Sequence, residues 1–102
     1  MGIDLSWQEE DGTPLEVVGD PRSHLSHLVQ RVDLAGTMCL RFLDPYGDTT
    51  FNQLQIPVLK AEIEDVMSGE EAPQVREHLR QILDLVGKAA GQVHTYLKFV
   101  GD

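Results

Sequence analysis

The sequence predicts an α+β fold: a small two-layer domain in which about three helices cover one face of a mostly antiparallel sheet. Segments in which apolar and polar residues alternate occur near both ends and in the middle of the chain, which is typical of half-buried strands. Segments with apolar residues three and four positions apart lie between them, which is typical of amphipathic helices. A length of 102 residues predicts one domain, residues 1–102, with the element order ββ-α-ββ-α-α-β.

The N-terminal third is predicted to form a hairpin followed by a helix. Residues 3–8 alternate between apolar and polar, and residues 15–18 supply a return strand after an acidic turn that contains a glycine. Asp20 is the expected N-cap of the helix, with Pro21 at its first position. Gly36 is suited to the helix end.

A second hairpin is predicted next. The even-numbered residues of 38–43 are expected to face one side of the sheet and the odd-numbered ones, Arg41 among them, the other side. The turn is Asp44–Asp48, in which Gly47 is expected to supply a positive φ.

Two helices and a final strand complete the expected fold. The helices span about 57–68 and 73–91, each with a proline near its start. Residues 92–100 are β-branched and aromatic, and their alternation predicts a strand with residues 93, 95, 97 and 99 on one face. A continuous helix through Tyr96 is the alternative for this segment.

The charge of the chain restricts the classes of partner. Seventeen acidic residues against eight Lys and Arg give a formal net charge of −9. Nucleic acids and anionic membrane surfaces need a basic face, so we expect neither as a partner. A basic protein is the expected partner class. Cys39 is the only cysteine, so no internal disulfide can form, and we expect a reducing, bacterial-type cytoplasm.

No cofactor or metal site is expected. His24 and His27 are spaced for two metal ligands on a helix, but Arg31 lies one turn later and nothing at ligand spacing completes the site. The turn Asp44–Asp48 resembles the opening of a calcium loop, yet Gln55 stands where an EF-hand has its bidentate glutamate. Both patterns are interpreted as structural.

The sequence contains no nucleophile elbow and no glycine-rich phosphate loop, so we expect no catalysis. In size and charge the chain is similar to small acidic immunity and inhibitor proteins of bacteria. We therefore expect a non-catalytic protein-binding module of inhibitor, immunity-like or regulatory type.

The residues expected to contact the partner are of two kinds. Some are polar or aromatic and lie with Asp4 and Ser6 on the sheet face that the helices leave uncovered, and the others are acidic and lie on or just after the second helix: Arg41, His94, Tyr96, Lys98, Glu62, Asp65, Glu70 and Glu71.

Two other functions stay open. If the last strand is a sheet edge, Tyr96 and this strand could pair with a second copy to form a homodimer. A small enzyme would need a pocket with convergent polar groups, for which His94, Tyr96 and Asp44 are the candidates.

Overall fold

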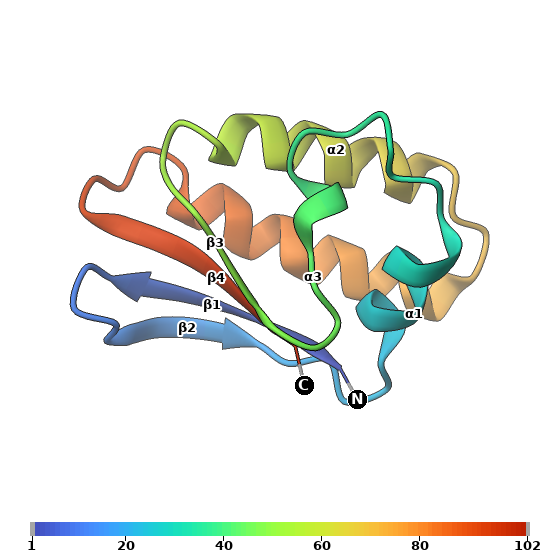
Figure 1. The fold of residues 1–102 in the computed structure, drawn as a ribbon, viewed down its shortest axis with the longest axis horizontal. Helices are drawn as coiled ribbons and strands as arrows, with labels where there is room; N and C mark the ends of the chain where they lie inside the picture. The colour runs from blue at the N-terminus through green and yellow to red at the C-terminus, as the bar shows by residue number, and fades with distance from the viewer. Residues whose placement is uncertain (1, 102) are drawn as a thin grey trace.

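Four antiparallel strands form one layer of the structure and three α-helices form the other (Figure 1). The computed structural model describes residues 2–101. In chain order the elements are β1 (Ile3–Glu9), β2 (Pro14–Val18), α1 (His24–Arg31), the 3-10 helix η1 (Leu40–Phe42), β3 (Asp48–Phe51), α2 (Ile56–Ser68), α3 (Pro73–Ala89) and β4 (Thr95–Gly101). The predicted α+β class, with a sheet and three helices, is confirmed.

The sheet has the order β2-β1-β4-β3, so β1 and β4 are its central strands. Leu5 of β1 lies opposite Phe99 of β4, and Leu97 of β4 lies opposite Phe51 of β3. Thr95, Leu97 and Phe99 are all buried, which confirms a strand there and rejects the helix. The strand begins at Thr95 and not at residue 92, and Val93, expected on the same inward face, lies before it and is 72% exposed. The edges are β2 and β3, so the last strand does not have the edge position on which the homodimer alternative depends.

The core lies between the two layers. The rings of Phe51 and Phe99 meet edge to face, with 5.8 Å between their centroids. Ile56 and Leu59 of α2 and Val86 of α3 are fully buried against them in one cluster. Leu25 and Leu28 of α1 belong to the same cluster, so all three helices contribute to one core.

The predicted strand over residues 38–43 is wrong. The chain there forms η1 instead, so the middle of the fold contributes one strand, β3, and no hairpin. Cys39 and Leu40 are both buried, whereas Met38 and Phe42 are 69% and 58% exposed. An alternating strand cannot bury two consecutive side chains on one face, and a helical turn can.

The turn Asp44–Gly47 does form, but not for the expected reason. The Gly47 N–H donates to the Asp44 carbonyl at 3.3 Å. Within residues 2–101, the only glycines with a positive φ are Gly12 and Gly91, so Gly47 does not supply one. The tight contact is at Gly101, where a Cβ would lie 2.2 Å from the Asp44 carbonyl oxygen.

Asp20 caps α1 from a distance. The helix begins at His24, later than predicted, and the residue before it, Ser23, has a φ of 58°. The Asp20 carboxylate is buried and accepts hydrogen bonds from the N–H groups of Leu25 at 3.3 Å and Ser26 at 3.2 Å. It also accepts one from the Ile3 N–H at 3.0 Å, so one side chain connects the start of α1 to the start of β1.

His78 of α3 completes this buried contact. Its Nε2 lies 3.3 Å from Oδ1 of Asp20, and the residue is 8% exposed. Burial lowers the pKa of His78, and this outweighs the opposing effect of the Asp20 carboxylate. Burial therefore favours the neutral form of this imidazole.

Candidate protein-binding surface

The helices cover only one side of the sheet, and the opposite side is open (Figure 1). We call this side the open face. Paired residues of antiparallel strands project to the same side, so the register identifies its members. They are Asp4, Ser6 and Gln8 of β1, Val17 of β2, Asp48 and Thr50 of β3, and Tyr96, Lys98 and Val100 of β4.

The predicted residues Tyr96 and Lys98 thus lie on the face where they were expected, near its centre. Both are half-buried. Apolar side chains accompany them, because Val17 is 54% exposed and Val100 is 37% exposed. The face combines an aromatic ring, aliphatic groups and polar groups, which is the composition of many protein interfaces.

Carboxylates dominate the charge of the sheet layer. The strands and the turn between β1 and β2 contain six acidic residues and one lysine: Asp4, Glu9, Glu10, Asp11, Glu16, Asp48 and Lys98. The lysine is partly neutralised, since Lys98 Nζ lies 3.3 Å from Asp48 Oδ2. Glu16 is paired with Lys88 of α3 at 3.0 Å. Of these residues, Asp4, Asp48 and Lys98 lie on the open face, which therefore has a formal charge of −1, and Glu10 and Asp11 of the turn lie at its end.

His94 lies at the end of the open face and not in a strand. It precedes β4, has a φ of 63°, and its Nδ1 lies 2.7 Å from Glu10 Oε1. Glu10 and His94, with Glu9, Asp11 and Val93, line a shallow open hollow between the two adjoining turns. The predicted side chain is therefore beside the face, in an acidic setting.

Arg41 is not on the sheet at all. It belongs to η1, and its guanidinium lies over the ring of Phe42, 4.8 Å from the centroid. The expectation that Arg41 shares a sheet face with Tyr96 is wrong, because residues 38–43 do not form a strand.

The three residues named for the alternative of a small enzyme do not lie together. His94 precedes the first residue of β4, whereas Asp44 packs against Gly101 at the last. A whole seven-residue strand, about 20 Å long, separates them. His94, Tyr96 and Asp44 therefore cannot converge on one substrate.

Glu62, predicted to contact a partner, holds η1 in place. Its carboxylate accepts hydrogen bonds from the N–H groups of Met38 at 2.6 Å, Cys39 at 3.0 Å and Leu40 at 3.1 Å. Burial raises the pKa of Glu62, but these three donors together outweigh burial and the pKa lies below its ordinary value. This contact between residues far apart in the sequence is the physical reason that a helical turn replaces the predicted strand.

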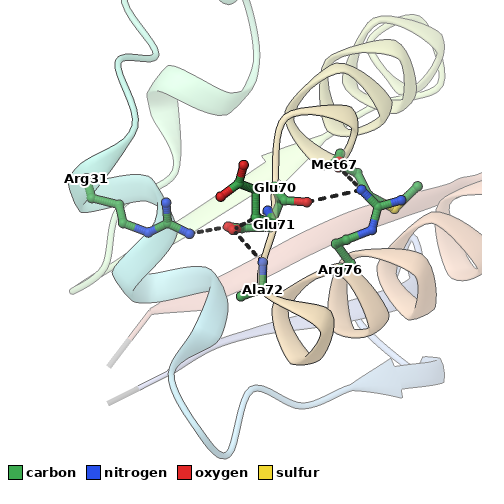
Figure 2. Close-up of polar contacts among 6 residues, drawn as sticks. All are labelled: Arg31, Met67, Glu70, Glu71, Ala72 and Arg76. Carbon is green, nitrogen blue, oxygen red and sulfur yellow. Dashed lines mark hydrogen bonds and ion pairs between the residues drawn. The ribbon is translucent and has the colours of Figure 1, made fainter.

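Glu70 has a similar internal role, shown in Figure 2. Its carboxylate pairs with Arg31 at the end of α1 and accepts the N–H groups of Glu71 and Ala72, just before α3. The hydrogen bond from Arg31 is the main cause that lowers the pKa of Glu70. Arg76 donates to the backbone carbonyls of Met67 and Glu70 at 3.1 Å and closes the turn between α2 and α3.

The four predicted acidic residues therefore divide into two pairs. Glu62 and Glu70 are occupied by contacts inside the molecule. Asp65 and Glu71 are exposed on the helical side. The open face also contains residues that the sequence interpretation missed, Val17 and Val100. The sequence shows that these valines alternate with inward-facing residues along their own strands. It does not show which strands lie side by side in the sheet.

Within residues 2–101, no three His, Cys, Asp or Glu side chains lie together in a way that could hold a metal ion. In the same part of the chain, no helix has the length and apolar character needed to cross a bilayer. Comparison of the chain with protein-family models, curated proteins and solved structures found no match.

Proposed function

We propose that this chain is a non-catalytic protein-binding module that binds a basic protein through the open face. The observation that carries the proposal is the chemistry of that face. An antiparallel sheet commonly exposes one face to water, so an uncovered face alone does not indicate a binding site. Here it presents Tyr96, Val17 and Val100 within a layer that has six carboxylates and one lysine.

The two kinds of group have different roles in such a complex. Burial of Tyr96 and the valines would supply affinity, since aromatic and aliphatic anchors dominate binding energy in most interfaces. The carboxylates would accelerate encounter with a positively charged surface and exclude acidic proteins. The proposal therefore includes an affinity that falls as the salt concentration rises.

A cytoplasmic location belongs to the same proposal. Cys39 is the only cysteine and is buried. Burial chiefly, and Glu62 in addition, raise the pKa of its thiol, so the group is a poor nucleophile. A chain stabilised by packing, with no disulfide, is suited to a reducing compartment.

The test is affinity capture from the cells that make the chain, with the immobilised wild type and two variants. Tyr96→Ser/Val100→Ser removes apolar groups of the open face. Leu54→Ser removes one that is 87% exposed but lies outside the strands, and serves as the matched control. We expect a basic protein to be retained by the wild type and the control at low salt, and lost with the double variant. Retention by all three, or by none, would contradict the proposal.

A further inference from the structure

We infer that the partner presents an extended, basic segment that adds to β2 as a fifth strand of the sheet. This inference rests on the proposed function and specifies the geometry of the complex and the chemistry of the bound segment.

The edge of β2 is available for such pairing. β2 is hydrogen-bonded to β1 on one side and is last in the order of the sheet. Residues 14–17 are all exposed, with Leu15 at 45% and Val17 at 54%. The outer side of an edge strand carries N–H and C=O groups without strand partners, which an extended chain can satisfy. Pro14 blocks pairing only at the first position.

The opposite edge is less available. β3 has four residues, and the hydroxyl of Thr49 donates to the carbonyl of Phe42 at 3.0 Å. The chain that leaves η1 is therefore held against β3 by a side-chain hydrogen bond, whereas within residues 2–101 the backbone of β2 accepts and donates no hydrogen bond outside its pairing with β1. Of the two edges, β2 is the one that can accept a strand.

Charge selects a basic segment over a second copy of this chain. Full antiparallel overlap of two β2 strands would place Glu16 opposite Glu16 of the other copy, and like charges opposite one another are destabilising. Each copy also has a formal net charge of −9. A cationic segment would instead be attracted, because Glu16 lies in β2, Glu10 and Asp11 lie in the turn before it, and Glu9 ends β1.

The alternation of β2 also predicts the pattern of the bound segment. A residue placed opposite Val17 would lie on the open face beside an aliphatic group, and favours an apolar side chain. A residue opposite Glu16 would lie on the other face beside a carboxylate that is 43% exposed and pairs with Lys88 of α3 at 3.0 Å, and a Lys or Arg there would add to this ion pair. The segment should therefore alternate basic and apolar residues.

The test titrates the full chain, labelled with nitrogen-15, with a seven-residue peptide that alternates lysine and valine. We expect amide chemical shifts to change at residues 14–18 and hydrogen exchange there to slow. Val17→Lys should weaken binding at least about tenfold. Leu54→Lys makes the same change, from an exposed aliphatic side chain to lysine, outside the strands, and should leave affinity within about twofold. Circular dichroism checks that both variants fold.

A second peptide isolates the backbone contribution. The same sequence with N-methylated valines keeps every charge but loses half of its N–H donors, and we expect it not to bind. Equal binding of both peptides, equal loss in the two variants, or no binding by the wild type would overturn the addition of a strand to β2. The capture experiment tests the proposed function independently, so these outcomes would overturn strand addition to β2 without contradicting binding through the open face. Dimerisation of the free chain through β2, seen by sedimentation, would also overturn the inference.

Discussion

The buried carboxylate of Asp20 offers the sharpest test of the fold. It accepts three backbone N–H groups, from Ile3, Leu25 and Ser26, at 3.0 to 3.3 Å. Asp20→Ala would leave three buried donors without a partner, at about 1–3 kcal/mol each. We take the lower part of that range because water can enter beside an alanine, and expect a loss of about 3–5 kcal/mol. That is a large fraction of the 5–15 kcal/mol typical of domains.

Urea unfolding followed by circular dichroism measures the loss. With an m value of about 1.5 kcal/mol/M, the midpoint should fall by about 2 M or more. Asp33→Ala is the matched control, since Asp33 accepts one N–H, from Ala35 at 3.0 Å, in an exposed position. It should cost less than about 1 kcal/mol. If Asp20→Ala is too unstable to measure, Asp20→Asn keeps one acceptor oxygen and should fall between them. Equal losses for Asp20→Ala and Asp33→Ala would refute the reasoning.

Three further outcomes are expected. Gly101→Ala should lower the free energy of unfolding by more than about 2 kcal/mol in thermal melts, because its Cβ would lie 2.2 Å from the backbone oxygen of Asp44. Gly47→Ala should lower it less, since the Cβ there would meet only the side chain of Asp44, which can move. Glu62→Ala should lower the free energy of unfolding, measured in urea, by about 1–3 kcal/mol and increase hydrogen exchange at residues 38–42. Glu64→Ala, at an exposed position of the same helix, should change it by less than about 0.5 kcal/mol. Because burial lowers the pKa of His78 in the folded chain, the unfolded chain binds a proton first as the pH falls. The contribution of neutral His78 to the free energy of unfolding should therefore be fully present above about pH 6.5 and decline below it. The urea midpoint of His78→Gln should fall less between pH 7 and 5 than that of the wild type.

The sequence was informative wherever the residue pattern is local. Alternation in residues 92–100 predicts a strand with residues 93, 95, 97 and 99 inward, and all of these side chains except Val93 are buried. The same rule failed for residues 38–43, because their conformation depends on a carboxylate more than twenty positions away. Glu62 supplies the acceptors that a helical turn needs for its first N–H groups. The local pattern of residues 38–43 does not include Glu62, so it cannot predict this helical turn.

The candidate surface was predictable in part for the same reason. Tyr96 and Lys98 follow from the alternation of their own strand. Their neighbours Val17 and Asp48 do not, because they depend on the order β2-β1-β4-β3, which local patterns do not determine. Glu70 appeared to be free surface charge, but it is the partner of Arg31, on a helix almost forty positions earlier.

The central position of β4 has a consequence for the order of folding. β1 pairs with β4 from Glu9↔Thr95 to Ile3↔Gly101, so the two central strands of the sheet are about 90 residues apart in the sequence. Closing a loop of that length costs about 4 kcal/mol of chain entropy before any contact compensates for it. During synthesis the β1–β2 hairpin must wait, without its central neighbour, until residues 95–101 have left the ribosome. We therefore expect slow folding for a chain of this size, with a rate limited by the arrival and docking of β4.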